Sequence, residues 1–215
     1  MKYTKEQFDA MPVVDGYKVC PSGDYTAIKR FGISCSFGER CRFGDGCSFG
    51  EGCSFGEGCR FGERCRFGVS CVFGERCSFG EGCSFGEWCS FGISCGFGEG
   101  CSFGERCSFG ASCSFGERCS FGASCSFGAS CRFEKNYRAL PGSPLMMLGG
   151  CGSAHRMVYA FNVEGGPLIR AGCFVGTLDK FRAKVREDGD KLKCIQYLGW
   201  ANIVAATWCP ERIEP

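Results

Sequence analysis

The sequence of 215 residues has little of several features that would direct a chain to common functional classes. Its formal net charge is only +2, so no overall field favours binding to nucleic acid or to an anionic membrane. The longest lipid-like stretch, residues 144–148, is far too short to span a bilayer, and the N-terminal residues lack the apolar core of a signal peptide. We therefore expect a soluble, cytoplasmic protein with no membrane contact.

Two side-chain types are scarce where specific functions would need them. The single histidine is His155, and residues 31–133 contain no threonine. The lack of threonine excludes the flat threonine ladder that binds ice. The lack of histidine leaves residues 31–133 without a general base that titrates near neutral pH. We expect His155, beside Arg156, to be a solvated turn residue.

What the chain has instead is one six-residue unit, Cys-x-Phe-Gly-x-x, repeated without insertion or deletion. Cysteine recurs at every sixth position from Cys35 to Cys131, and phenylalanine recurs with the same step from Phe31 to Phe133. On an extended strand these two side chains point the same way, while the serine or arginine between them points to water. The glycine after each phenylalanine predicts a corner that needs permissive backbone dihedrals, followed by two polar turn residues. The repeat therefore predicts a β-solenoid with phenylalanine and cysteine inside.

This pattern resembles the hexapeptide repeat of left-handed parallel β-helices, which have three faces and eighteen residues per coil. The bulky position departs from that family, because it is always phenylalanine here. Phenylalanine with a small partner is also similar to pentapeptide-repeat solenoids, which have four faces but a period of five. The period favours three faces. The expected fold is mainly β, a three-sided, left-handed, single-stranded parallel β-helix with a small C-terminal α+β domain.

The composition divides the chain into four parts. Residues 1–30 form an N-terminal cap, in which Thr4 and Gln7 predict a helix capping box and residues 13–30 are irregular. Residues 31–133 form the solenoid, and residues 134–155 form a linker. The small α+β domain then occupies residues 156–215.

Within the C-terminal domain, two strands, Arg156–Val163 and Pro167–Val175, are expected around a glycine-rich turn. Thr177 and Asp190 then cap two helices, the first ending near Gly189. The segment from Ala171 to Phe181 resembles one found at the ends of repeat proteins encoded by bacteriophages, which implies a viral or mobile-element origin and no defined chemistry.

The 22 cysteines are first of all packing residues, since seventeen of them occupy the repeat position. Reduced cysteine behaves as a small buried apolar side chain. Zinc and iron–sulfur sites need convergent ligands, and a fixed step of six residues on an inward ladder does not converge on a point. The hexapeptide resemblance would imply an acyl-coenzyme A-dependent acyltransferase or a zinc carbonic anhydrase, but their histidines are missing. We expect no catalytic residue, metal ligand or cofactor.

Two surface features follow from arranging the sequence in rows of eighteen. One is an acidic column, Asp45, Glu63, Glu81, Glu99 and Glu117. The other is a weakly apolar strip, Ile93, Ala111 and Ala129, which we expect to receive residues 137–215 or a second copy of the chain. Trp88, an aromatic residue at an outward corner, completes the candidate interaction surface.

These observations predict a non-enzymatic structural or protein-binding β-solenoid whose protein partner the sequence does not identify. A homo-oligomer remains open, and nucleic acid is not an expected partner. The alternative is an inhibitor that mimics DNA or otherwise blocks a host enzyme, such as gyrase or a defence protein, in the host cytoplasm. An acyltransferase is the third and weakest hypothesis.

Overall fold

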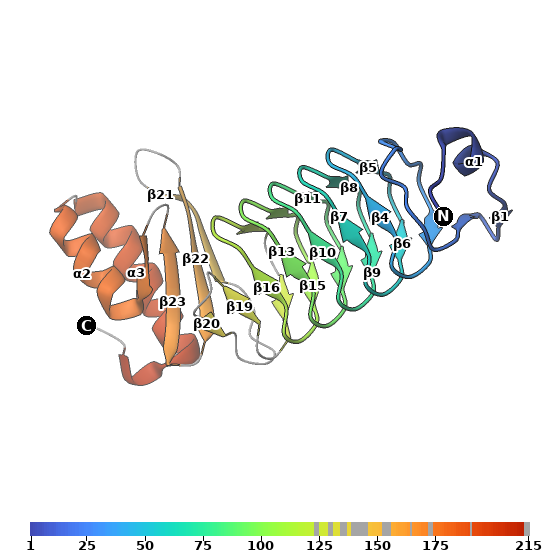
Figure 1. Ribbon diagram of the computed structural model, residues 1–215. Helices are drawn as coiled ribbons and strands as arrows, with labels where there is room; N and C mark the ends of the chain where they lie inside the picture. Colours follow the sequence, from blue (N-terminus) through green and yellow to red (C-terminus); the bar gives the residue numbers. More distant parts are fainter. Residues whose placement is uncertain are drawn as a thin grey trace.

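The computed structural model describes residues 1–122, 125–128, 131–133, 137–138, 146–151, 156–163, 165–171, 174–189 and 191–212. Parallel stacked coils form a rod, with the N-terminal segment at one end and a sheet with two helices at the other (Figure 1). The predicted β-solenoid with a small C-terminal region of strands and helices is thus confirmed. No helix of these described ranges is both long and apolar enough to cross a membrane.

Three sheets form the sides of the rod, and we call them faces 1, 2 and 3. Face 1 runs β1 (Val13–Val14), β2 (Tyr17–Cys20), β3 (Cys35–Phe37), β6 (Ser54–Phe55), β9 (Val72–Phe73), β12 (Ser90–Phe91), β15 (Ser108–Phe109) and β18 (Ser126–Phe127). Face 2 runs β4 (Arg42–Phe43), β7 (Arg60–Phe61), β10 (Ser78–Phe79), β13 (Gly96–Phe97), β16 (Ser114–Phe115), β19 (Arg132–Phe133) and β20 (Tyr137–Arg138). Face 3 runs β5 (Ser48–Phe49), β8 (Arg66–Phe67), β11 (Ser84–Phe85), β14 (Ser102–Phe103) and β17 (Ser120–Phe121).

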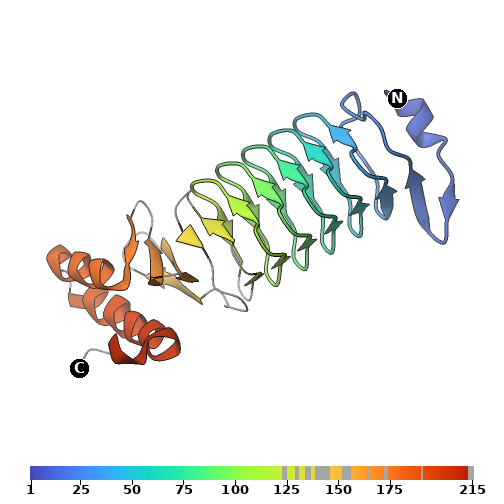
Figure 2. The same ribbon diagram turned by 60° about the horizontal axis from the view of Figure 1, so that its bottom comes forward.

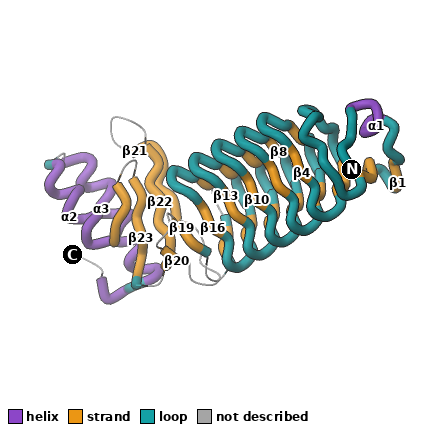
Figure 3. The backbone as a smooth tube through the Cα atoms, in the orientation of Figure 1, coloured by secondary structure: helices purple, strands orange, loops and turns teal. Residues whose placement is uncertain are grey.

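The register of these sheets fixes the number of faces. Ser84 on β11 pairs with Ser102 on β14, and every parallel pair among the repeats has the same offset of eighteen residues. Consecutive strands of the chain therefore lie on different faces. The prediction of three faces is confirmed and four faces are excluded, while the left-handed sense of the coil stays an expectation from the resemblance. Figure 3 shows how short the strands are within each coil.

The phenylalanine rings fill the centre of the rod. The Phe85 ring stacks on the rings of Phe67 and Phe103, each with 4.8 Å between centroids, and meets those of Phe79 and Phe91 edge-on at 5.0 Å. The repeat phenylalanines from Phe31 to Phe127 are all buried. Burial of one such side chain contributes about 1.5–3 kcal/mol, and each favourable aromatic pair adds about 0.5–1.5 kcal/mol. The core is therefore strong and the same in every coil.

The structure of the corners corrects the expectation that the glycine after phenylalanine is needed for its backbone dihedrals. A Cβ atom on Gly86, which follows Phe85, would lie 2.8 Å from the carbonyl carbon of Gly68 and from the amide nitrogen of Val69 in the preceding coil. From Gly38 to Gly128, the glycine after each phenylalanine is thus needed because a Cβ atom there would lie too close to the preceding coil, whereas Gly32 has open space around it. The left-handed dihedrals occur two residues later, where φ is 64° at Gly82 and 56° at Arg64. That position accepts glycine, arginine and serine, since its side chain points to solvent.

The N-terminal segment continues the rod as an imperfect first coil. Helix α1 (Lys5–Asp9) begins with the predicted Thr4–Gln7 capping box and buries Phe8 against the end of the core. The Tyr25 and Phe43 rings stack with 5.6 Å between centroids, which extends the aromatic column. Residues 13–30 were expected to be irregular, but β1 and β2 lie within them. β2 forms because the open edge of β3 supplies backbone hydrogen-bond partners that local sequence does not reveal.

A four-stranded antiparallel sheet closes the other end of the rod. Its order is β21 (Met146–Cys151), β22 (Arg156–Val163), β23 (Gly166–Ala171) and β24 (Phe174–Thr177). The helices α2 (Leu178–Asp188) and α3 (Lys191–Trp208) cover the side of this sheet that faces away from the solenoid, and η1 (Pro210–Arg212) follows (Figures 1 and 2).

Several C-terminal expectations can be compared with these elements. Thr177 caps α2 and Gly189 ends it with a φ of 69°, both as predicted, whereas Asp190 lies outside the described residues. The single strand expected at 167–175 divides into β23 and β24. The expected linker, 134–155, contains β20 and β21, because β20 folds back antiparallel on β19 and β21 pairs antiparallel with β22.

Candidate interaction surfaces

The cysteines line the interior as one column of thiols behind each face. The Cys89 Sγ–H donates to the carbonyl oxygen of Gly68 in the preceding coil at 3.4 Å, and the same contact recurs from Cys53 to Cys131. Hydrogen bonding to the Cys119 thiol, followed by burial, raises the pKa of the Cys101 thiol to about 12. The repeat thiols from Cys35 to Cys131 are all buried, and a structural cysteine buried in apolar surroundings is inert. The columns therefore have a packing role, and the outer surface is the place to search for function.

The acidic column lies along the corner between faces 2 and 3, as the eighteen-residue period predicts. Backbone hydrogen bonds stack its turns one on another, for example from Arg64 N–H to the Glu81 carbonyl at 2.8 Å. Its carboxylates are not all free, since Arg118 pairs with Glu99 at 3.2 Å. At the first of these turns the Asp45 carboxylate accepts the backbone N–H of Glu63 at 2.9 Å. The structure therefore aligns the column but offsets part of its charge.

Trp88 and Ile93 lie on the two corners that border face 1. Trp88 is 53% exposed, and the Arg106 guanidinium lies over its ring, 4.8 Å from the centroid. Ile93 is 42% exposed and lies above Ala111, whose carbonyl accepts the Ser94 N–H at 2.9 Å. Ala129 lies outside the described residues. Trp88 and Ile93 are thus both available for contacts.

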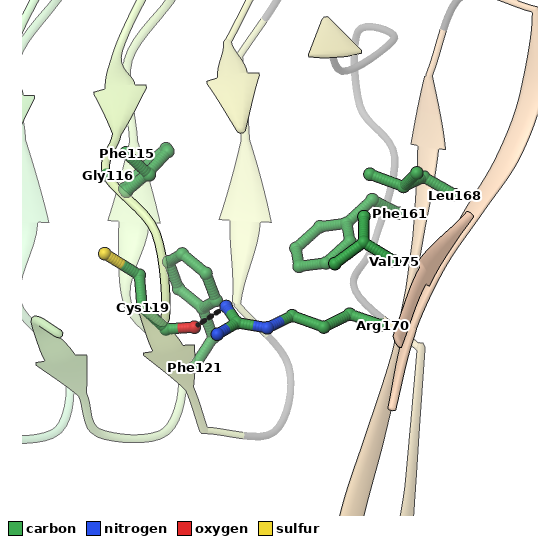
Figure 4. A pocket seen from close by; sticks show the side chains of 8 residues that line it. All are labelled: Phe115, Gly116, Cys119, Phe121, Phe161, Leu168, Arg170 and Val175. Atoms are coloured by element: carbon green, nitrogen blue, oxygen red, sulfur yellow. Dashed lines mark hydrogen bonds between the residues drawn. The ribbon is translucent and has the colours of Figure 1, made fainter. Parts of the chain in front are cut away.

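The described C-terminal residues leave the expectation for the strip of Ile93 and Ala111 a prediction, since Ala129 lies outside the described residues. They pack on the end of the last coils, where the Phe161 ring meets the Phe121 ring edge-on with 6.0 Å between centroids. Arg170 Nη1–H donates to the carbonyl oxygen of Cys119 at 2.6 Å (Figure 4). The C-terminal sheet packs better on the open end of the rod than along a corner, because the end exposes apolar rings and backbone acceptors. The cavity there, of about 10 Å3, has room for no more than one water molecule.

One surface cluster was missed by the sequence reasoning. Arg40, Arg42, Arg60 and Arg76 surround an open hollow at the corner between faces 1 and 2. Arg42 and Arg60 are direct neighbours on face 2, and Arg76 pairs with Glu57 at 2.7 Å. The eighteen-residue period could have predicted part of this cluster, because Arg42 and Arg60 are eighteen residues apart and therefore lie on adjacent strands.

Comparison with family models finds similarity to the RNA-binding, Nab2-type zinc finger. The matched residues are 30–50, 41–56, 47–62, 59–74, 65–86, 76–92, 101–116, 106–122 and 118–133. They cover less than half of the chain. This family is neither the hexapeptide-repeat family nor a phage protein family. No curated protein and no solved structure matches the chain.

The residues present do not fit a zinc finger. Such fingers bind zinc through four convergent cysteine or histidine ligands, and the matched residues include no histidine. Consecutive repeat cysteines belong to different faces, and cysteines of one face stack in a line along the rod. Among the residues that the structure describes, no group of three or more metal-ligating side chains could hold a metal ion. The matched residues therefore lack the convergent ligand set of a zinc finger.

Proposed function

We propose that the chain is a non-enzymatic structural and protein-binding β-solenoid. The observation that carries this proposal is that the repeat separates constant core positions from variable surface positions. Phenylalanine, cysteine and glycine form the core and the contacts between coils, which are the same in every coil. Chemical variety is confined to the exposed corner residues and the residues between cysteine and phenylalanine. A rigid rod with a variable surface is suited to presenting side chains to another macromolecule.

The interior supports a binding role better than a catalytic one. The rings and thiols pack without a ligand-sized space inside the described coils, and the coils project no loop that would build a site. An acyltransferase of the hexapeptide type would need a histidine base near a corner, and the single histidine, His155, lies outside the repeats. The resemblance to hexapeptide and phage repeat proteins remains part of this proposal, with a host protein as the partner and a cytoplasmic location.

A DNA mimic is the second candidate, and the unbroken acidic column is the observation that favours it. Its charge can be compared with that of DNA. Duplex DNA carries about one negative charge per 1.7 Å of axis, so a rod of about 30 Å would need about 18 negative charges. The repeats from residue 31 to 132 contain eleven acidic and nine basic residues, a net charge of −2. The charge density therefore favours a protein-binding role that does not depend on imitating DNA.

An affinity capture experiment with matched variants tests the proposal. The bait is the full chain, and the test variant carries Glu63→Gln, Glu81→Gln and Glu99→Gln on the acidic column. The control variant carries Glu51→Gln, Glu87→Gln and Glu105→Gln on another corner, which removes the same charge. A partner that the wild type and at least one variant capture in stoichiometric amount supports the proposal. Acyl transfer to or from coenzyme A by the purified chain would contradict it.

A supercoiling assay tests the second candidate. A DNA mimic should inhibit gyrase, and the substitutions on the acidic column should relieve that inhibition more than the control substitutions do. Equal inhibition by all three proteins would exclude a specific role for the acidic column, and no inhibition would exclude gyrase as the target.

A further inference from the structure

Three exposed arginines at the corner between faces 1 and 2 have no acidic partner. Arg42 and Arg60 occupy paired positions on β4 and β7, which lie side by side in Figure 1, and Arg40 lies on the corner beside them. None of the three forms an ion pair with a carboxylate of the described residues, whereas Arg76 and Arg118 each pair with a glutamate of the preceding coil. Like charges opposite each other on adjacent strands are destabilising, so an anion from outside the chain would stabilise this cluster.

Asp24 is the acidic residue that lies next to Arg42 along face 2, in an isolated bridge. Its Oδ1 atom accepts the Thr26 N–H at 2.9 Å and the Thr26 Oγ1–H at 2.6 Å. The Asp24 carboxylate is thus bound to its own turn, and the Arg42 guanidinium stays available to a ligand.

Gly58 creates the hollow that the arginines surround. Arg40 and Arg76 hold the same corner position as Gly58 in the coils on either side, as the bonds from Arg40 N–H to the Glu57 carbonyl and from Gly58 N–H to the Glu75 carbonyl show, both at 2.8 Å. Only the middle coil lacks a side chain there, which leaves an open hollow of about 480 Å3. The Arg40 and Arg76 side chains border this hollow along the rod.

The spacing of the bordering arginines fits one phosphate group. Two coils separate Arg40 from Arg76, which places their Cα atoms about 9.6 Å apart at about 4.8 Å per coil. A guanidinium that donates two hydrogen bonds of about 2.8 Å to a phosphate lies about 4 Å from the phosphorus atom, so two guanidiniums on opposite sides of it are about 8 Å apart. The long arginine side chains close the remaining distance. Arg42 and Arg60 reach the same hollow from face 2 and add further donors.

Acidic residues around the hollow restrict the kind of phosphate that it accepts. Glu57 lines the hollow and pairs with Arg76 at 2.7 Å, and Glu39 and Glu75 hold the same corner position in the adjacent coils. A nucleic acid would bring the next phosphates of its backbone toward these carboxylates, and like charges repel. A peptide with one phosphorylated side chain brings a single phosphate, and a lysine beside that side chain would pair with Glu39 or Glu75. The corner therefore favours an isolated phosphate on a peptide.

We propose that the phosphate site, formed by Arg40, Arg42, Arg60 and Arg76 around Gly58, binds a phosphorylated serine or threonine of a partner protein. This inference rests on the proposed function and gives the chemistry of its partner. A planar guanidinium donates two parallel hydrogen bonds to a phosphate, and a phosphorylated side chain offers three strong acceptor oxygens. The unmodified hydroxyl offers no charge to the arginines, so binding depends on phosphorylation of the partner.

Fluorescence anisotropy of labelled probes with the full chain, at physiological ionic strength, tests the inference. The probe is a peptide that carries one phosphoserine between two lysines, and the comparison probes are the same peptide without phosphate and a short oligouridylate. We expect the phosphopeptide to bind about tenfold or more tightly than either comparison probe. Equal binding of the two peptides would overturn the inference. Tighter binding of the oligouridylate would assign the site to nucleic acid, and inorganic phosphate that binds as tightly as the phosphopeptide would assign it to the free ion.

Matched variants show whether the binding depends on the phosphate site. The site variant carries Arg40→Gly with Arg76→Gly, and the control variant carries Arg64→Gly with Arg118→Gly on the corner between faces 2 and 3. Both variants remove two arginines from the same turn position and break an ion pair with a glutamate of the preceding coil. Glycine already holds that position in a neighbouring coil of each corner. The site variant should raise the dissociation constant of the phosphopeptide about tenfold or more, and the control variant less than twofold. Equal weakening by both variants would overturn the inference.

Gly58→Glu tests the hollow without removing an arginine. The new carboxylate would occupy the place of the phosphate, so phosphopeptide binding should weaken about tenfold or more. Gly82→Glu on the other corner is its control and should leave binding unchanged. Phosphopeptide binding that Gly58→Glu leaves intact would contradict the proposed location. A wild type that binds no phosphopeptide but still captures a protein partner would overturn the phosphate site alone, whereas acyl transfer by the purified chain would overturn the proposed function alone.

Discussion

The two glycine positions of the repeat should respond differently to substitution. A methyl group at the glycine after phenylalanine should destabilise the fold more than an arginine side chain two residues later. Gly86→Ala adds one methyl group, and its Cβ would lie 2.8 Å from three backbone atoms of Gly68 and Val69. Carbon atoms pack at about 3.5–4.0 Å, so the two coils must separate by several tenths of an ångström. The backbone bond from Gly86 N–H to the Phe67 carbonyl, now 2.9 Å, would lengthen. Overpacking and two or three weakened hydrogen bonds together predict a loss of about 2–4 kcal/mol.

Gly82→Arg is the matched variant, with a far larger side chain. Gly82 has a φ of 64°, and Arg64 and Arg118 already hold the equivalent place one and two coils away with φ of 56° and 57°. The left-handed backbone with a side chain costs about 1 kcal/mol after the gain in unfolded-state entropy. Urea unfolding followed by far-ultraviolet circular dichroism compares the midpoints. A midpoint for Gly86→Ala at or above that of Gly82→Arg would refute the close-approach explanation.

Three further predictions concern the core and its C-terminal end. Phe85→Ala should lower the free energy of unfolding by about 3–5 kcal/mol, because its six ring neighbours lie 4.8–5.8 Å away; a urea midpoint equal to that of Ser84→Ala would contradict this. The pKa of the Cys101 thiol rises on folding from 9.0 to about 12, so the unfolded chain loses this proton at a lower pH than the folded chain. The free energy of unfolding should therefore fall above pH 9, by up to about 1.4 kcal/mol per pH unit for this thiol. A urea midpoint that is unchanged between pH 8 and pH 10 would contradict this prediction. Arg170→Met removes the bond to the Cys119 carbonyl and should cost about 1–3 kcal/mol, with faster hydrogen exchange confined to the last coils; exchange that is unchanged there would contradict the proposed end contact.

The sequence alone predicts the solenoid well, since its strict period leaves few solutions. Cysteine and phenylalanine two residues apart must share a side of a strand, and a step of six then places the next pair on the next face. The same period aligns the acidic column from Asp45 to Glu117.

The remaining features depend on contacts that the period does not contain. Gly86 needs the absence of a side chain because of Gly68 in the preceding coil, not because of its own dihedrals. The strand β2 forms on the open edge of β3, and β20 on the edge of β19, so both follow from exposed backbone groups at the rod ends. The location of the C-terminal sheet follows from the same cause, since Phe161 covers the last aromatic rings.

The central claim is that residues eighteen apart are direct neighbours on an outward face, and disulfide trapping measures this most directly. Ser84→Cys with Ser102→Cys places two outward-facing thiols on adjacent strands of face 3, at a Cα separation of about 4.8 Å, within disulfide range. Ser84→Cys with Ser108→Cys is the control with a separation of twenty-four residues. Mild oxidation and peptide mapping should give the 84–102 disulfide in high yield and no 84–108 disulfide. An 84–108 disulfide without an 84–102 disulfide would contradict the three-sided coil.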